Sequence, residues 1–485
     1  MTVIFERMFA NQTRHPIRWL TAIAFLLALQ ISPDWLPTPD ANAYLSIARS
    51  IATRHQLLML GYADMAYPPG YPLLVSPAFL VAPRPFFTIS VIQWLLAIAF
   101  MVGLYKWSIR QTPEAGLLVT ILVLVNVTLW IYYRRALSEV AFMAVSIWGV
   151  LFLDRALEST RFRQRIFNTV VGTLLLVFLT LIREVGVLFG AALLMSICLR
   201  VCTRRLMART AAWMAAIVFF PVFATLVGFV LCSQLTFART HVFGTHLSGL
   251  LDSRVSFFDR VVDGVRLQIY AIGRLMVPGM FKAYGHRWLD ANSLVYVPVC
   301  VALALGWKRW VVHRYDVYAL VLPFYLLVYA IWDFDADTRY LLPILPLLAI
   351  SLWYLIEPLK SYRLTVLAAL ICLHLFVALG YWATVELREA QRCNSQWAPI
   401  SVLAAAVENR PEEIAAVVGV PQCARLMFSF LLDRPVYDLR IYPSEMSRAD
   451  WLLQRSNQPV VQGFEREHTD DGYALSLRKP PIARR

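Results

Sequence analysis

Long apolar segments alternate with short polar connections through the first 385 residues. Eleven of these segments hold about 15–20 mostly apolar residues, close to what a tilted helix needs to cross the hydrocarbon core of a bilayer. The predicted spans cover residues 17–33, 86–105, 115–131, 138–153, 166–182, 185–199, 211–232, 291–306, 315–332, 340–356 and 364–383. The pattern predicts an all-α polytopic membrane protein.

Two pieces between the first and second spans follow a different pattern. Residues 71–81 are apolar but too short to span, and prolines near both ends favour a re-entrant or interfacial segment. Ahead of it, Tyr44, Ile47, Ala48 and Ile51 share one face if the chain is helical. This spacing predicts an amphipathic helix at the membrane interface.

The chain becomes polar after residue 385. Candidate elements there are a helix over 404–407 and strands over 414–420, 436–439 and 473–477. We therefore expect a transmembrane domain over residues 1–385 and a small α+β domain over residues 386–485.

The distribution of Lys and Arg predicts the orientation. With the N-terminus in the cytoplasm, the inner connections carry 18 basic residues, whereas the short outer ones carry Arg134, Arg135, Arg183 and Arg339. An odd number of spans then places the C-terminal domain outside. The long loops 34–85 and 233–290 fall on the same outer face of the cytoplasmic (inner) membrane.

Composition agrees with a membrane protein and narrows the function. Of 485 residues, 59% are hydrophobic and 16% are charged, against about 25% charged in soluble domains. The net charge of +14 fits cytoplasmic Lys and Arg, because no basic patch interleaved with aromatics indicates nucleic acid. The sequence lacks the motifs of P-loop ATPases, dinucleotide-binding enzymes, zinc peptidases and serine hydrolases.

Asp40 is the strongest candidate for chemistry. It opens the predicted interfacial helix, where the helix dipole favours an ionised carboxylate. An N-cap is the ordinary interpretation of an Asp at this position, and one carboxylate can serve both roles. The turn Tyr67-Pro-Pro-Gly-Tyr-Pro then leads the chain back to the bilayer, with Tyr67 and Tyr71 as interfacial aromatics.

Other ionisable residues lie at the outer ends of spans. Ionisable groups so close to the bilayer suggest function, although short-loop solvation and Arg–carboxylate pairing also explain them. Arginines there can hold a phosphate bidentately, and carboxylates can act as bases or metal ligands. The candidates are Arg134, Arg135, Glu139, Arg183, Glu184, Arg339 and Tyr340.

Evidence for a metal site or a disulfide is weaker. The sequence leaves open whether the protein uses a divalent metal as a cofactor. Asp333, Asp335 and Asp337 are weak candidate ligands, since their spacing is not that of an EF-hand. The histidines of the second long loop lack zinc-ligand spacing and are interpreted as solvated: His241, His246 and His286. Cys393 and Cys423 could form a disulfide in an oxidising compartment, and geometry decides the matter.

The loop motifs resemble those of a known family. Asp40-x-x-x-Tyr44-Leu-x-x-Ala48, followed by Tyr67-Pro-Pro-Gly-Tyr-Pro-Leu-Leu, resembles the first outer loop of GT-C glycosyltransferases. The protein O-mannosyltransferase and aminoarabinose-transferase branch is the most similar. Ser138-Glu139, Arg183-Glu184 and Arg339-Tyr340-Leu-Leu-Pro-x-x-Pro match it as well, and the layout agrees over about residues 15–385.

The resemblance implies transfer of a sugar from a polyprenyl-phosphate donor on the outer face. Asp40 takes the role of base, and the outer arginines stabilise the phosphate leaving group. Residues that contact the acceptor or support the site are Glu139, Glu184, Tyr44, Tyr67 and Tyr340. Direct displacement would invert the anomeric centre. The chain departs from relatives at Ala41, where many carry Glu, and at Ala66-Tyr67, where aminoarabinose transferases place a Lys before the prolines.

Two other functions stay open at this stage. A transporter or lipid-linked sugar flippase would also be polytopic, but transporters usually place ionisable residues at mid-membrane. A structural or assembly subunit explains the topology but not the gathering of Asp40 with the outer arginines. The sequence names neither the sugar nor the acceptor, which could be lipid, glycan or protein.

Overall fold

The computed structural model describes most of the membrane part and portions of the C-terminal part. The described residues are 15–34, 36, 38–59, 67–240, 257–277, 293–331, 338–408, 415–418, 420, 422–432, 436–438, 449–462, 464–470 and 473–478. The proposed metal ligands Asp333, Asp335 and Asp337 lie outside them, as do His241, His246 and His286. The side chains of Cys393 and Cys423 are likewise outside the described set.

Helices dominate the chain, as expected. Up to residue 202 they are α2 (Pro16–Ala28), α3 (Pro39–Arg54), α4 (Gly70–Val75), η1 (Ser76–Leu80), α5 (Phe86–Gln111), α6 (Gly116–Leu124), α7 (Val127–Tyr133), α8 (Glu139–Glu158), α9 (Phe162–Ile182), η2 (Glu184–Gly186) and α10 (Val187–Cys202). They continue as α11 (Ala208–Thr240), α13 (Phe257–Met276), α14 (Ser293–Arg314), α15 (Val317–Ile331), η3 (Thr338–Ile344), α16 (Leu345–Ile356), η4 (Glu357–Tyr362), α17 (Arg363–Tyr381), η5 (Trp382–Glu386), α18 (Leu387–Glu408) and α19 (Gln422–Leu432).

Each of the eleven predicted spans falls on a helix, but they are not equally long. In the described part of the chain, eight helices are long and apolar enough to cross a membrane. A ninth candidate is the pair α6–α7, which bends by 54°. Helices α2 and α15 have 13 and 15 residues, hence about 20 Å and 23 Å of length, less than the hydrocarbon thickness of about 30 Å.

The bend between α6 and α7 has a local cause. Asn126 takes an extended conformation there, and its side chain caps α7 by accepting a hydrogen bond from the Thr128 amide. Its amide nitrogen donates to the Leu275 carbonyl oxygen at 2.7 Å. A hydropathy pattern cannot reveal this break, because the residues on both sides of Asn126 are apolar.

The bundle has an inner and an outer set of helices. Helix α8 packs between α5 and α9. In its most apolar stretch of 18 residues 78% of the residues are buried, whereas only 17–22% are buried in the corresponding stretches of α11, α14 and α17. Exposed aromatics such as Phe220 and Phe376 cover the outer helices, as expected where lipid replaces water. The all-α membrane fold is confirmed.

The C-terminal part forms a small α+β unit. Its strands are β1 (Ala415–Val417), β2 (Val436–Asp438), β3 (Trp451–Arg455), β4 (Phe464–Asp470) and β5 (Tyr473–Arg478). The sheet order is β2-β1-β3-β5-β4, with β1 parallel to β2 and β3, and β5 antiparallel to β3 and β4. Helix α19, β3 and β4 were not predicted from the sequence.

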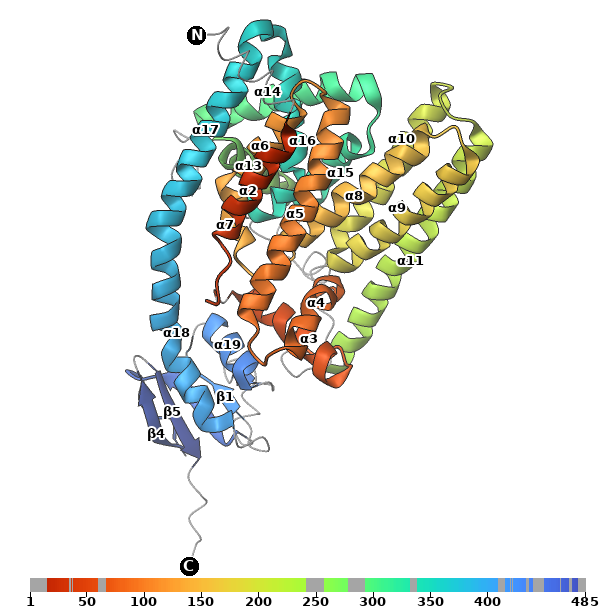
Figure 1. Ribbon diagram of the computed structural model, residues 1–485. Helices are drawn as coiled ribbons and strands as arrows, with labels where there is room; N and C mark the ends of the chain where they lie inside the picture. Colours follow the sequence, from red (N-terminus) through yellow and green to blue (C-terminus); the bar gives the residue numbers. More distant parts are fainter. Residues whose placement is uncertain are drawn as a thin grey trace, which may run out of the picture.

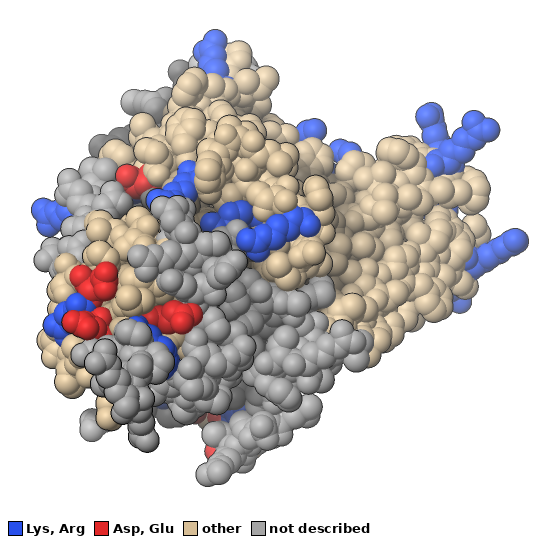
Figure 2. Space-filling model, turned by 90° about the horizontal axis from the view of Figure 1, so that it is seen from below, with Lys and Arg blue, Asp and Glu red and all other residues tan. Residues whose placement is uncertain are grey.

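The short helices lie at one end of the bundle. In Figure 1, α3 and α4 lie at the same end as α19 and the sheet, and α17, η5 and α18 form a continuous helical run toward that sheet. From that end, acidic and basic side chains gather on one side, whereas the flank of the bundle is mostly uncharged with basic side chains at its edge (Figure 2). The expected helix after the first span is α3, which buries Tyr44, Ile47 and Ala48.

Gly70 makes a close approach that holds α4 against α9. A Cβ atom at Gly70 would lie 2.6 Å from the Leu181 carbonyl carbon and 2.7 Å from the Ile182 nitrogen. These are backbone atoms that cannot swing away, so the contact requires glycine. It brings the turn after Tyr67 next to the C-terminal end of α9.

We expect Gly70→Ala to destabilise the protein by about 1–3 kcal/mol, the usual cost of overpacking. Thermal unfolding of the purified protein in detergent measures this as a lower melting temperature. Gly380→Ala is the matched control, because among the described residues no atom beyond the local helix backbone lies within 4 Å of a Cβ at this glycine. Equal melting temperatures for the two variants would contradict the tight contact.

Candidate active site

A polar pocket lies where several helix ends meet near α3. Its volume is about 680 Å³, counting space that is open to solvent. The residues around it come from the start of α3, the turn before α4, the start of α8, η2, the end of α15 and η3. They are Asp40, Tyr44, Tyr67, Pro68, Leu137, Ser138, Glu139, Arg183, Glu184, Val185, Tyr329, Arg339 and Tyr340. Most of the residues singled out from the sequence therefore come together.

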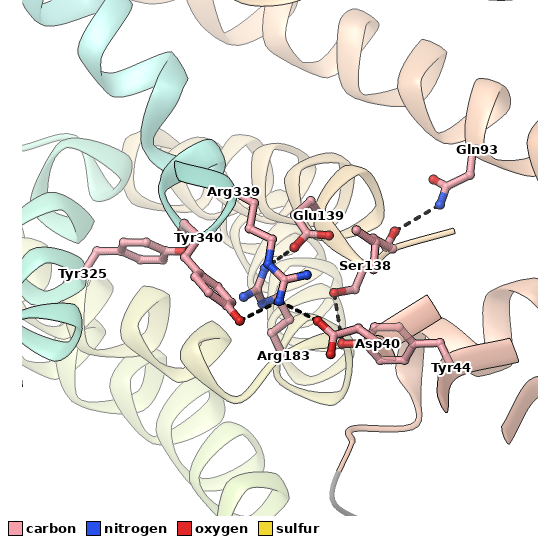
Figure 3. A network of polar contacts seen from close by, with 10 residues as sticks. Asp40, Tyr44, Gln93, Ser138, Glu139, Arg183, Tyr325, Arg339 and Tyr340 are labelled. Atoms are coloured by element: carbon pink, nitrogen blue, oxygen red, sulfur yellow. Dashed lines mark hydrogen bonds and ion pairs between the residues drawn. The ribbon is translucent and has the colours of Figure 1, made fainter. Parts of the chain in front are cut away.

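Asp40 is not the cap of its helix. Thr38 is the N-cap, and its Oγ1 accepts a hydrogen bond from the Ala41 amide at 3.1 Å. The interpretation of Asp40 as an N-cap is therefore wrong. Because Thr38 satisfies the helix end, the Asp40 carboxylate is free to face the pocket (Figure 3).

Both oxygens of Asp40 have partners there. Oδ2 lies 2.5 Å from Arg339 Nη2, and Oδ1 accepts a hydrogen bond from the Tyr67 hydroxyl at 2.8 Å. The Asp40 and Arg339 side chains are 24% and 16% exposed, so a ligand in the pocket can reach the pair.

Arg339 is held by its neighbour in η3. Its Nη2 also donates to the Tyr340 hydroxyl at 2.6 Å, and its guanidinium carbon lies 4.6 Å from the centre of the Tyr340 ring. The Tyr340 carbonyl oxygen accepts a hydrogen bond from the Tyr325 hydroxyl at 2.8 Å. These contacts fix the direction of a charged side chain at the mouth of the bundle.

A second ion pair lies beside the first. Arg183 Nη1 is 3.3 Å from Glu139 Oε1, and both side chains are nearly buried. Arg183 follows α9 in an extended conformation, and Glu139 is the first residue of α8. The Arg183 guanidinium carbon lies 5.1 Å from the centre of the Tyr340 ring, so one tyrosine contacts both arginines. Glu139 Oε2 is buried and has no hydrogen-bond partner among the described residues.

Tyrosines form the apolar wall of the pocket. The Tyr44 ring meets those of Tyr67 and Tyr71 edge to face, with centres 5.1 Å and 5.2 Å apart. The Tyr44 hydroxyl is 3.3 Å from Ser138 Oγ, and the Tyr71 hydroxyl accepts a hydrogen bond from Gln93 Nε2 at 2.6 Å. These contacts tie the short helices to α5 and α8.

The tyrosines next to Asp40 remain protonated. Burial raises the pKa of Tyr67 well above its usual range, and the negative charge of Asp40 raises it further. The pKa of Tyr44 is also raised, first by burial and then by Asp40. A neutral Tyr67 can donate to the carboxylate, so it orients Asp40 rather than competing with it for charge.

Two predicted phosphate ligands take other positions. Arg134 Nη2 lies 3.3 Å from Asp34 Oδ2 and 3.2 Å from Ser32 Oγ. The Arg135 guanidinium carbon lies 5.6 Å from the centre of the Tyr132 ring. Neither residue lines the pocket, so among the candidate arginines the pocket contains Arg183 and Arg339.

Sequence reasoning missed Tyr329 and Gln93. Both lie inside apolar helices, where polar side chains are hard to assign to a site. For Tyr329 the sequence did offer a signal, because Tyr325 lies one helical turn before it and shares its face.

The described residues include no group of three His, Cys, Asp or Glu side chains that could hold a metal ion. The pocket thus offers carboxylates for proton transfer and guanidiniums for an anion.

Comparison with known proteins establishes the fold. No family model and no curated protein sequence matches the chain. Among solved structures, ArnT from Cupriavidus metallidurans bound to undecaprenyl phosphate is similar, with a TM-score of 0.58, 11% identity and coverage of 95% of this chain and 97% of that one. An archaeal oligosaccharyltransferase from Archaeoglobus fulgidus, in complex with an inhibitory peptide and a dolichol-phosphate, gives a TM-score of 0.54 at 11% identity and covers 91% and 70%. The chain therefore shares its fold with these two proteins.

The assignment of the cap to Thr38 can be checked directly. We expect Thr38→Val to weaken the first turn of α3 by about 1 kcal/mol, which corresponds to about fivefold faster amide exchange there. Hydrogen–deuterium exchange with mass spectrometry measures this. Thr53→Val is the control, because the Thr53 hydroxyl is exposed and bonds only the Arg49 carbonyl oxygen one turn back. Unchanged exchange in the Thr38 variant would return the capping role to Asp40.

Proposed function

We propose that this protein is an integral membrane glycosyltransferase. It moves a sugar from a polyprenyl-phosphate donor to an acceptor hydroxyl, as part of glycosylation in the cell envelope. The observation that supports this most strongly is the pair Asp40–Arg339 in an open pocket, within a chain that aligns end to end with an enzyme solved with undecaprenyl phosphate bound.

The reaction is a single displacement at the anomeric carbon. Asp40 accepts the proton of the acceptor hydroxyl while its oxygen forms the new bond to that carbon. The bond between the anomeric carbon and the phosphate oxygen breaks, and its electron pair leaves with the polyprenyl phosphate. Guanidiniums beside the phosphate stabilise the charge that develops there. Displacement from the opposite side inverts the anomeric centre.

Arg339 has two roles in this scheme. In the unliganded pocket it bonds Asp40 Oδ2, the oxygen that would otherwise receive the acceptor proton. A donor phosphate offers Arg339 a stronger anionic partner. When Arg339 turns to the phosphate, Oδ2 is released, while the Tyr67 hydroxyl still holds Oδ1. Donor binding thus prepares the base for the acceptor.

Arg183 and Glu139 provide the second half of the phosphate site. Arg183 lies close to Tyr340, which also contacts Arg339, so both guanidiniums can approach one phosphate. Glu139 keeps Arg183 charged and oriented, and its unpartnered Oε2 is available to a hydroxyl or other donor group of the substrate. Glu184 lines the same pocket and has a supporting role.

The pocket lies on the outer face of the cytoplasmic membrane, and the N-terminus lies in the cytoplasm. Helix α8 starts at Glu139 beside the pocket, α9 ends just before Arg183, and the connections at their far ends carry the basic residues. The positive-inside rule assigns those far ends to the cytoplasm. Residues 386–485 form an outer domain, supported by their separate apolar core around β1 and α19.

The acceptor presents a hydroxyl, since removal of its proton by the Asp40 carboxylate is enough to make the oxygen a nucleophile. Lipid, glycan and protein hydroxyls all meet this requirement. The fold gives the transporter and flippase alternatives no support, because the similar structures are those of transferases.

The role of Asp40 is tested by mass spectrometry of cell-envelope glycans and lipids from a deletion strain that carries variant genes. We expect wild type to restore one sugar addition and Asp40→Asn to lower it at least about 100-fold, because the amide cannot take up the proton. Asp34→Asn is the matched control, since this carboxylate also pairs with an arginine but lies outside the pocket. Full restoration by Asp40→Asn would refute the mechanism, and an unchanged envelope in the deletion strain would refute the function.

The role of Arg339 is tested with undecaprenyl phosphate as the probe. We expect Arg339→Met to weaken its binding about 10- to 100-fold, because a charged hydrogen bond contributes about 1.5–3 kcal/mol. Native mass spectrometry or ligand-dependent thermal shift measures the affinity. Arg134→Met should bind as wild type does. A loss of equal size in the Arg134 variant would move the phosphate site away from the pocket.

A further inference from the structure

Helix α3 carries Asp40 but is not one of the spanning helices. It has 16 residues, and its position depends on the elements packed around it. In the described structure these are η1 and α4 on one side and α19 of the C-terminal part on the other. What holds α3 therefore also sets the geometry of Asp40 against Arg339.

One side chain joins α3 to α19 through two contacts. Arg49 Nη2 donates to the Phe430 carbonyl oxygen at 2.5 Å, and the Arg49 guanidinium carbon lies 4.5 Å from the centre of the Phe430 ring. A hydrogen bond along the guanidinium plane combined with a cation–π contact fixes both distance and direction.

Phe430 belongs to the membrane part of the core although it lies in α19. Its side chain is fully buried within the apolar cluster of the helix bundle. By contrast, Met427, Phe428 and Leu431 belong to the separate cluster over the C-terminal sheet. Helix α19 thus buries one face on its own sheet and inserts Phe430 toward the bundle beside α3.

We propose that Arg49 and Phe430 are positioning residues, through which the C-terminal part holds α3 and keeps Asp40 aligned with Arg339. The effect on catalysis rests on the proposed glycosyl transfer. The mechanical effect, which is that the C-terminal part holds α3 in place, does not. Arg49 is about 14 Å from Asp40 along the helix axis, at about 1.5 Å per residue. It does not line the pocket, so it acts only through the placement of the helix.

A displacement of α3 should lower the rate of sugar transfer, and it should have little effect on the affinity for the donor. The phosphate is held by Arg339 and Arg183, which lie on other elements, so loosening α3 removes no phosphate ligand. A weaker pair between Asp40 and Arg339 leaves Arg339 freer for the phosphate, so the affinity for the donor should not fall. The proton transfer does depend on α3, because small displacements of a catalytic group are costly to the rate. A role that is merely structural would instead lower the amount of folded protein and leave the activity per folded molecule unchanged.

The mechanical part is tested by hydrogen–deuterium exchange of the full-length protein in detergent. We expect Arg49→Met and Phe430→Ala each to speed exchange in peptides from residues 39–54 at least about threefold, with α8 and α9 unchanged. Arg49→Lys should exchange nearly as wild type, because an ammonium can make both contacts. Arg54→Met is the matched control, since Arg54 is exposed at the end of the same helix. Wild-type exchange of α3 in both disrupting variants would overturn the proposal.

The catalytic part is tested on the same variants with two further measurements. We expect Arg49→Met to lower the envelope product per folded molecule about tenfold while undecaprenyl phosphate binds at least as tightly as in wild type, and Arg49→Lys to restore the product. Arg49→Met removes both contacts, whereas Phe430→Ala removes the ring contact and keeps the carbonyl oxygen. The loss in the double variant should therefore be smaller than the sum of the two single losses, because the ring contact is lost in both. Full activity per folded molecule in both single variants, or a parallel loss of phosphate binding, would overturn it. If wild type itself adds no sugar, the proposed function fails, and the exchange data still decide the mechanical part.

Discussion

The ion pair between Asp40 and Arg339 is the contact around which the pocket is organised. It joins the first helix after the first span to η3, which lies near the end of the membrane part in sequence. Both side chains of the pair are partly buried, and this degree of burial affects what the pair can do. Fully buried charges pay a desolvation cost that their attraction often fails to offset, and fully exposed pairs contribute little. A pair that a ligand can still reach combines a defined geometry with the ability to exchange partners.

Helix ends, rather than helix centres, supply the charged groups of the site. Glu139 starts α8, Arg183 follows α9, and Arg339 lies in the short turn η3. Charges at these positions avoid the cost of the bilayer centre and find partners among the polar side chains of neighbouring helix ends. Close backbone approaches at Gly70 and Gly186 bring these ends together, since a Cβ at either glycine would collide with the last turn of α9.

The sequence predicted the features that depend on local pattern. Apolar length predicted a helix for every span, and polar residues beside span ends predicted Asp40, Glu139, Arg183 and Arg339, all of which line one pocket. It did not predict which charge pairs with which, because pairing depends on how distant helices pack. For the same reason Arg134 was grouped with the pocket arginines, although its partner in the structure is Asp34.

Errors in the C-terminal part have a different physical origin. Strand β4 is charged and exposed along most of its length and contains an irregularity between Arg466 and His468, so it lacks the alternation that reveals a strand. Strand β3 is buried over four consecutive residues and lacks alternation for the opposite reason. Both are strands because of their partners in the sheet, not because of their own pattern.

The non-spanning character of α3 links these observations. The spanning helices are kept in register by the bilayer and by each other, and the groups at their ends inherit that order. Helix α3 does not span the membrane, yet it carries Asp40, the carboxylate that we propose as the base. Its position is set by its packing against η1, α4 and α19, by the tyrosines that meet Tyr44, and by Arg49 on Phe430. If Arg339 turns to a donor phosphate as we propose, these contacts, rather than the bilayer, keep Asp40 in place.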